Sequence, residues 1–167
     1  NVTERKKLET EVKESNARFL AIFQDSPVGM VITNKQTKKY ANVNQTFLDT
    51  FGFKYEHEVV GKNGEEVNII APEERARVYE IIRERGDLLH EEIKCHTKSG
   101  KQMTILMSTN SVEINGEFHL LSSFIDMSEK KMLEQEVKKS NERFVRLFYN
   151  SPIGMSLRDV ETSECKM

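Results

Sequence analysis

The chain has 167 residues, of which 31% are charged and 37% hydrophobic, and its formal net charge is −2 at pH 7. This length suits one domain with a substantial core plus flanking elements. Basic and acidic residues are interleaved, so we expect no nucleic-acid partner, which would need a basic stripe. No run of 18 apolar residues occurs, so the sequence predicts no transmembrane helix and no direct membrane contact.

The chemistry-bearing residues form no recognisable catalytic or metal-binding set. The two cysteines, Cys95 and Cys165, lie far apart and have no CxxC partner, which is typical of a reducing compartment, so we expect a cytoplasmic protein. His90 and His96 share one face of a predicted strand while Cys95 points to the other, so we expect no metal site. Neither a P-loop nor a nucleophile elbow is present. The sequence therefore predicts no catalytic residue and no enzyme.

An internal repeat sets the organisation of the chain. Residues 8–34 align without a gap to residues 133–159, an offset of 125 residues, with 14 of 27 positions identical. A match this dense indicates a repeated structural unit of about that length. The repeat predicts four segments, which are a linker helix at 1–24 that follows a preceding unit, a complete unit at 25–128, a second linker helix at 129–149, and the start of a second, truncated unit at 150–167.

Both linker helices carry a heptad seam, in which seam residues recur at alternating spacings of four and three. The polar serine at the middle of each seam weakens it. We expect these helices to form a homodimer contact, and the alternative is that each packs on its own domain. The seam residues are Leu8, Val12, Ser15, Phe19 and Ile22 in the first helix, and Leu133, Val137, Ser140, Phe144 and Leu147 in the second.

Between the linkers, the pattern alternates strands with short helices, and it predicts an α+β fold with one five-stranded antiparallel sheet. Asn44 is expected to cap a short helix that ends at Gly52, and Pro72 begins the longest internal helix. Residues 61–64 are expected to form a loop. The predicted strands are 29–33, 39–43, 89–97, 102–113 and 118–125, and the predicted helical segments between them are 45–51, 55–60 and 73–85.

Five motifs, in this order and at sensible spacing, together resemble those of the PAS domain family. The resemblance rests on the following motifs: Phe23-x-x-Ser26-Pro27-x-Gly29, Tyr40-Ala41-Asn42-Val43-Asn44, Val59-Val60-Gly61-Lys62, Lys98-Ser99-Gly100 and Asp126-Met127-Ser128-Glu129-Lys130-Lys131.

The resemblance implies a sensory and dimerisation module rather than an enzyme. It implies a five-stranded antiparallel sheet with short helices on one face and a cavity between them. Tandem PAS units joined by charged heptad helices are most similar to prokaryotic sensor histidine kinases, and cyclic-dinucleotide enzymes and transcription regulators are the alternatives. Neighbouring PAS and output domains would be the partners. A conformational change would leave through the exit residues Asp126, Met127 and Ser128 into the second linker helix.

The cavity is the remaining candidate for chemistry. Arg75, Arg77 and Lys94 are the basic residues considered for holding a ligand carboxylate. The alternative is that core side chains fill the cavity and no ligand binds. The predicted cavity residues are Met30, Ile32, Asn42, Phe47, Phe51 and Ile82.

The resemblance also bears on cofactors. The flavin-binding, light-sensing branch of the family needs a reactive cysteine, and here Gly64 stands in its place. A haem-binding member needs an axial histidine near residues 73–86, which contain none, and His57 is the nearby candidate. We therefore expect no cofactor and an unknown small-molecule ligand. A ligand-free structural spacer and a haem or flavin sensor stay open as alternatives.

Overall fold

The fold consists of helices packed on a single large sheet, followed by a long C-terminal helix. The structure, a computed structural model, describes residues 1–150, 157–158 and 165–166. The chain divides into two units, Asn1–Ser128 and Glu129–Met167. The elements of the first unit are α1 (Val2–Gln24), β1 (Gly29–Asn34), β2 (Tyr40–Val43), α2 (Gln45–Phe51), a 3-10 turn η1 (Glu56–Glu58), α3 (Gly64–Val67), α4 (Pro72–Arg85), β3 (Leu88–His96), β4 (Gln102–Ile114) and β5 (Glu117–Asp126).

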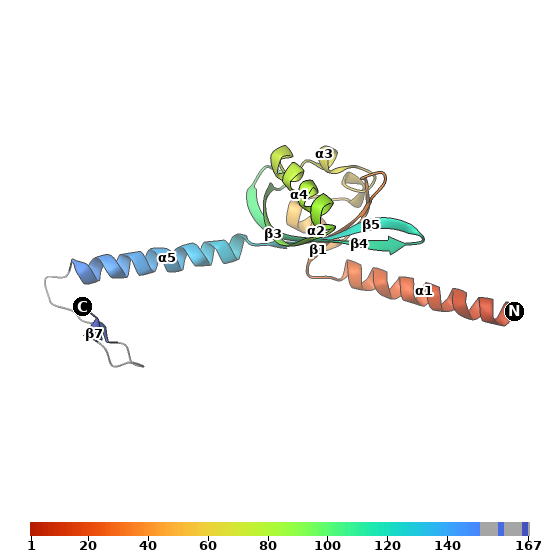
Figure 1. The fold of residues 1–167 in the computed structure, drawn as a ribbon, viewed down its shortest axis with the longest axis horizontal. Coiled ribbons are helices and arrows are strands. Elements are labelled where there is room, and N and C mark those ends of the chain that lie inside the picture. The colour runs from red at the N-terminus through yellow and green to blue at the C-terminus, as the bar shows by residue number, and fades with distance from the viewer. Residues whose placement is uncertain (151–156, 159–164, 167) are drawn as a thin grey trace. The chain divides into compact units, whose positions relative to one another are not determined.

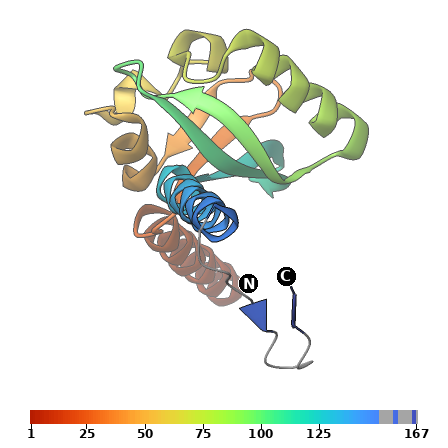
Figure 2. The same ribbon diagram turned by 90° about the vertical axis from the view of Figure 1, so that its left-hand side faces the viewer.

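The five strands form one antiparallel sheet in the order β2-β1-β5-β4-β3. The helices α2, α3 and α4 lie together over one face of this sheet (Figures 1 and 2). Because β1 pairs with both β2 and β5, the first hairpin is joined to the last strand of the unit. The predicted α+β fold with a five-stranded antiparallel sheet and helices on one face is confirmed.

An aromatic cluster fixes α2 against the middle of the sheet. The ring centroids of Phe47 and Phe51 lie 4.7 Å apart on the helix, and both rings meet Phe124 of β5 at 5.3 and 5.8 Å. All three side chains are buried. Edge-to-face geometry of this kind adds to the free energy gained by burying large apolar surfaces. The helical layer is thereby held directly on the strand that ends the unit.

Asn44 joins the end of α1 to this core. Its Oδ1 accepts hydrogen bonds from the backbone N–H groups of Met30 (2.8 Å) and Phe47 (3.0 Å). Its Nδ2 donates to the carbonyl oxygens of Phe23 and Val28, each at 2.9 Å. The side chain is fully buried and all four contacts are made, so the predicted helix cap is also the joint between α1, the following loop, β1 and α2.

One helix differs from the expectation that residues 61–64 form a loop. The short helix α3 begins at Gly64, and Asn63 is its cap. The Asn63 side chain accepts from the backbone N–H of Glu66, while the Glu66 carboxylate accepts from the N–H of Asn63 at 2.8 Å. This reciprocal capping box is visible in the sequence as Asn-x-x-Glu, but the two glycines of the segment favoured a loop.

The described residues of the second unit form all but the first residue of α5 and a short strand pair. The helix α5 spans Ser128–Tyr149, and β6 (Leu157–Arg158) pairs antiparallel with β7 (Cys165–Lys166). Most of the predicted second PAS start, 150–167, lies outside the described residues. Among the helices that the structure describes, none has the length and apolar character needed to cross a bilayer.

Candidate functional site

A cavity of about 60 Å³ lies between the helical layer and the sheet. Its floor follows one row across the three central strands, because Val31 pairs with Ser122 in register and Ser122 pairs with Thr109. Side chains of one parity on neighbouring strands face the same side of a sheet, which brings these residues together. The lining residues are Val31, Thr33, Lys38, Tyr40, Gly64, Ile69, Ile70, Arg75, Val78, Tyr79, Ile82, Met107, Thr109, Leu120, Ser122 and Phe124.

Of the six predicted cavity residues, Ile82 lines the cavity and the other five do not. Phe47 and Phe51 belong to the aromatic cluster that packs α2 on β5. The prediction for Met30, Ile32 and Asn42 is wrong because these residues lie on the face of the first hairpin that points away from the cavity. Val31 and Thr33 face the helices, so the alternate positions of β1 and its partner Asn42 of β2 face away.

Gly29 is the signal that could have set this parity. A Cβ at Gly29 would lie 3.2 Å from the Cα of Phe47, so the backbone of β1 approaches α2 closely at this point. Positions 29, 31 and 33 therefore share the helix-facing side. The difference is concealed because each face of β1 carries apolar residues, Val31 on the helix-facing side and Met30 and Ile32 on the other.

Two hydroxyl groups form the polar floor of the cavity. The Thr109 Oγ1 and Ser122 Oγ atoms lie 2.8 Å apart and are buried. One hydroxyl donates to the other, so one proton of the pair stays available for a further acceptor. Tyr40 also lines the cavity. Burial raises the pKa of the Tyr40 phenol to about 12, and Tyr79 makes a smaller contribution in the same direction. The phenol therefore stays protonated and remains a hydrogen-bond donor at neutral pH.

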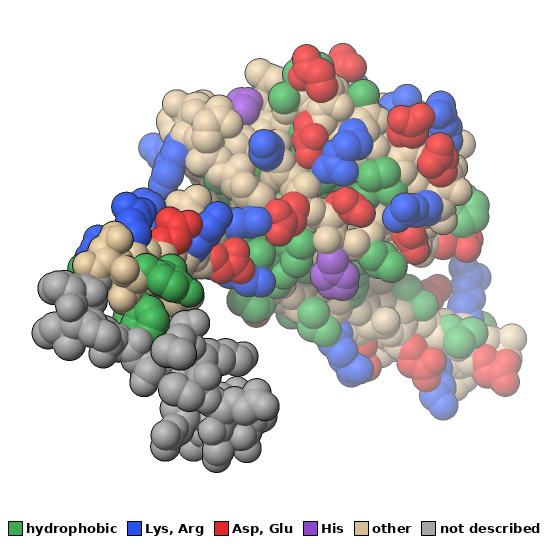
Figure 3. All heavy atoms as spheres, turned by 60° about the vertical axis from the view of Figure 1, so that its left-hand side comes forward, with side chains coloured by type: hydrophobic (Ala, Val, Ile, Leu, Met, Phe, Trp, Pro, Cys, Tyr) green, Lys and Arg blue, Asp and Glu red, His purple; other side chains and the backbone are tan. Residues whose placement is uncertain are grey.

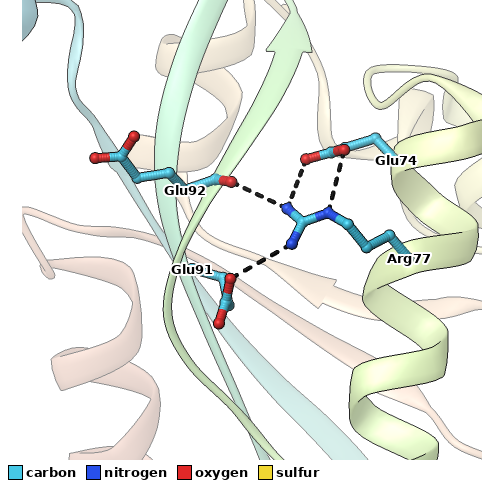
Figure 4. Close-up of polar contacts among 4 residues, drawn as sticks. All are labelled: Glu74, Arg77, Glu91 and Glu92. Atoms are coloured by element: carbon cyan, nitrogen blue, oxygen red, sulfur yellow. Dashed lines mark hydrogen bonds and ion pairs between the residues drawn. The ribbon is translucent and has the colours of Figure 1, made fainter.

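The three basic residues considered for a carboxylate have different surroundings. Arg75 lines the cavity and its Nη2 donates to the carbonyl oxygen of Ile70 at 2.7 Å. Lys94 is exposed on β3 and does not line the cavity. Arg77 is occupied elsewhere, because it joins α4 to the edge strand β3 (Figure 4). Arg75 is thus the member of this set that faces a prospective ligand.

The Arg77 contacts form a clamp that closes the side of the helical layer. Its Nη2 lies 2.7 Å from Glu74 Oε1, its Nη1 lies 3.4 Å from Glu91 Oε2, and Nη2 also donates to the backbone oxygen of Glu92 at 3.1 Å. A bulge between Leu88 and Glu91 turns the Glu91 side chain to the helix-facing side. The side-chain hydrogen bond between Arg77 and Glu74 lowers the pKa of Glu74 and raises the pKa of Arg77.

The residues considered for cofactors and metals lie apart from the cavity. His57 is exposed and stacks on Tyr55, with ring centroids 5.3 Å apart. Cys95 is buried, and burial raises the pKa of its thiol to about 12, with Asp126 adding to the shift. Among the described residues, no group of three or more histidine, cysteine, aspartate or glutamate side chains is placed to hold a metal ion.

The predicted exit residues lie at the end of β5. Asp126 still pairs with Ile105 of β4, and its Oδ1 accepts a hydrogen bond from the backbone N–H of Ser128 at 2.8 Å. The N–H of Met127 donates to the carbonyl oxygen of Thr104 at 2.8 Å, and its side chain is buried. The helix α5 begins at Ser128, so one residue separates strand from helix.

The seam residues of both linker helices are open to solvent. In α1, the apolar members are 42% to 66% exposed, and in α5 they are 55% to 65% exposed. Ser15 and Ser140 are also exposed. Figure 3 shows hydrophobic side chains on the surface of these helices among charged ones. The apolar members of the seams are Leu8, Val12, Phe19 and Ile22 in α1, and Leu133, Val137, Phe144 and Leu147 in α5.

Comparison with known proteins gives one family match. The model of the PAS domain matches residues 27–129, which include the whole sheet, the helices over it and the exit residues. No curated protein gives a significant match.

Solved structures show the same fold at low sequence identity. The PAS domain of an HTR-like protein from Haloarcula marismortui is 22% identical with a TM-score of 0.55, and the match covers 72% of this chain and 98% of that one. A PAS domain from a two-component sensor histidine kinase is 14% identical, with a TM-score of 0.55 and coverage of 70% and 98%. The LOV protein of Rhodobacter sphaeroides is 16% identical, with a TM-score of 0.57 and coverage of 69% and 68%.

Proposed function

The chain belongs to the PAS domain family, and we propose that it is a signal-relay and dimerisation module of a multi-PAS sensor protein, most like a histidine kinase. A PAS domain of a two-component sensor histidine kinase is among the similar structures, which supports this choice of parent. We expect neighbouring PAS and output domains as partners and a cytoplasmic location. Cyclic-dinucleotide enzymes and transcription regulators are the alternative parents.

One observation carries the proposal, which is that β5 both lines the cavity and leads into α5. Leu120, Ser122 and Phe124 of this strand face the cavity, and Asp126 is its last residue. A ligand that favours one packing of the helices on the sheet would shift β5 against β4. Because only Met127 separates β5 from α5, such a shift reaches the start of the helix directly. The ligand must bind the two packings with different affinities to move the equilibrium.

The exposed seams of the linker helices support a homodimer. An apolar seam on an isolated helix gains free energy when a second copy covers it. Two heptads with a central serine give a weak pairing, which a modest conformational change can alter. The seam would then convert a movement of β5 into a change of helix pairing that a following domain can detect.

The cavity supports a small colourless ligand over a large cofactor. Sites for drug-sized ligands measure about 300–1,000 Å³, whereas this cavity measures about 60 Å³. Flavin adduct chemistry needs a thiol, and Gly64, at the position where the flavin-binding branch carries its cysteine, has no side chain to supply one. The alternatives are a ligand-free spacer and a haem or flavin sensor. A visible absorption band from the purified protein would favour a cofactor, and native mass spectrometry would detect a colourless ligand.

The relay is tested with Ser140→Leu in the full-length parent protein. The substitution places an apolar residue in the seam and should lock the helix pair, so the signal-dependent change in output, measured as autophosphorylation if the parent is a kinase, should be lost. Lys139→Leu, next to the seam on the same helix, is the matched control and should leave the response intact. An unchanged response in Ser140→Leu would contradict the relay.

A further inference from the structure

We infer that the cavity takes a small carboxylate with a short apolar body, held by the Arg75 guanidinium and the Tyr40 hydroxyl. The inference rests on the proposed sensory function and adds the chemical class of the ligand. The carboxylate would lie beside Gly64 and its hydrocarbon part would lie over the sheet. No aspartate or glutamate is among the described residues that line the cavity. Its wall therefore holds no fixed negative charge that would repel a bound carboxylate.

The two proposed ligand contacts converge on one point. A Cβ built on Gly64 would lie 3.5 Å from Arg75 Nε and 3.5 Å from Tyr40 Oη. Both polar atoms therefore border the same small volume, which the absence of a side chain at Gly64 leaves open. A carboxylate is planar and has two oxygens, so it can accept from a guanidinium and a hydroxyl at the same time.

Both groups have hydrogen-bonding capacity to spare. A guanidinium has five N–H donors. The side-chain hydrogen bond that Arg75 makes runs from its Nη2 to the carbonyl oxygen of Ile70. Among the described residues, Arg75 forms no ion pair with a carboxylate, and the Tyr40 hydroxyl makes no hydrogen bond. Arg77, two residues further along α4, differs because Glu74 and Glu91 already neutralise it.

The rest of the cavity fits a short apolar body. Val31, Val78, Ile82, Met107 and Phe124 supply apolar walls. A water molecule needs about 10–15 Å³ of such volume, so about 60 Å³ corresponds to a ligand of only a few non-hydrogen atoms beyond the carboxylate. The hydroxyl of the Thr109–Ser122 pair that keeps its proton would donate a hydrogen bond to a hydroxyl or carbonyl oxygen on that ligand.

A cationic path leads from the surface to this cavity. An open groove beside α4 shares residues with the cavity, among them Lys38 and Tyr79. Its lining carries Lys35, Lys38 and Arg83, and the one carboxylate among its described lining residues, Glu80, pairs with Arg83 at 3.6 Å, so the groove keeps an excess of positive charge. Positive charges along a path raise the local concentration of small anions and their rate of association. The groove therefore favours anions over neutral molecules of the same shape before binding begins.

The test uses the 167-residue protein and butyrate as the probe, followed by isothermal titration calorimetry and amide chemical shifts. Butyramide, which has the same shape without the charge, and inorganic phosphate are the comparison ligands. We expect butyrate to shift the amides of cavity residues and to bind at least tenfold more tightly than butyramide or phosphate. Equal binding of butyrate and butyramide, or tighter binding of phosphate, would overturn the inference.

Variants locate the carboxylate. Arg75→Gln should weaken butyrate binding by about ten- to a hundredfold, as expected for loss of a charge-assisted hydrogen bond, and leave butyramide unaffected. Tyr40→Phe, which preserves shape and folding, should weaken butyrate by a smaller factor. Arg85→Gln, on the exposed face of the same helix, is the matched control and should leave binding unchanged. Unchanged butyrate affinity in both Arg75→Gln and Tyr40→Phe would overturn the inference.

The inference and the proposed function can fail separately. A neutral molecule that co-purifies in the cavity and alters the output would contradict the carboxylate and leave the sensory function standing. Butyrate that binds at Arg75 without any change in the α5 amides would support the carboxylate and contradict the relay. No shift of any cavity amide with butyrate at millimolar concentration would contradict the carboxylate alone.

Discussion

Replacing Asn44 with alanine removes the joint between α1 and the core, and we predict a loss of about 2–4 kcal/mol in the free energy of unfolding. The side chain is fully buried and makes four hydrogen bonds, to Phe23, Val28, Met30 and Phe47. Each bond contributes about 0.5–1.5 kcal/mol net. Phe47 N–H lies in the first turn of α2, where no helical partner exists, so it becomes unpaired in the variant. Water that enters the vacated space lowers the cost toward the smaller value.

The assay is urea unfolding followed by circular dichroism, with equal slopes required for the comparison. Asn42→Ala is the matched control, because Asn42 lies two residues away on β2 and, among the described residues, its side chain makes no hydrogen bond. The control should change stability by less than about 1 kcal/mol, as most substitutions outside such networks do. Equal losses in the two variants would refute the account of Asn44 as the joint.

Three further predictions concern a surface carboxylate, the seam and a thiol. Hydrogen bonds from the Lys98 side chain and from two backbone N–H groups lower the pKa of Glu58 to about 2. The ionised Glu58 carboxylate therefore stabilises the fold fully above pH 4.5, and this stabilisation is lost as the pH falls toward 2. In urea titrations the stability difference between wild type and Glu58→Gln should shrink over this range, and a constant difference would contradict the prediction. Val137→Lys replaces an apolar seam residue with a charge in both copies, and it should weaken the dimer about a hundredfold by sedimentation equilibrium, whereas equal affinities would argue against the seam. Cys95, with its thiol pKa near 12 and its side chain buried, should react with a thiol reagent only on unfolding. Mass spectrometry of the Cys95 peptide separates its labelling from that of Cys165, and rapid labelling of Cys95 in the native protein would disprove this.

The sequence was a good guide where local signals act alone. The cap at Asn44 and the stop at Gly52, which has a positive φ of 78°, define α2 as predicted. Motif order and strand periodicity together predicted the sheet and its helical layer. These features depend on residues close together in the chain, so the pattern carries them directly.

The cavity was predicted less well because its lining depends on parity and register. In β1 both faces carry apolar residues, so the alternation that normally reveals the buried face is absent. The approach of Tyr40, Gly64 and Arg75 joins three elements that are up to 35 positions apart, and no local pattern reports it. The bulge that turns Glu91 toward Arg77 is likewise set by pairing with β4 rather than by the residues of β3 alone.

The central claim is that the state of the cavity reaches α5 through β5, and amide chemical shifts measured by NMR test it most directly. Val78→Ala enlarges the cavity from α4, whereas Val112→Ala makes the same change on β4 at a residue that does not line it. The account predicts that Val78→Ala changes the amide chemical shifts of β5 and that these changes continue into Ser128–Met132. Val112→Ala should leave the amide chemical shifts of α5 unchanged. Shifts in Val78→Ala that stop at Phe124, with unchanged amides from Ser128 onward, would contradict the claim.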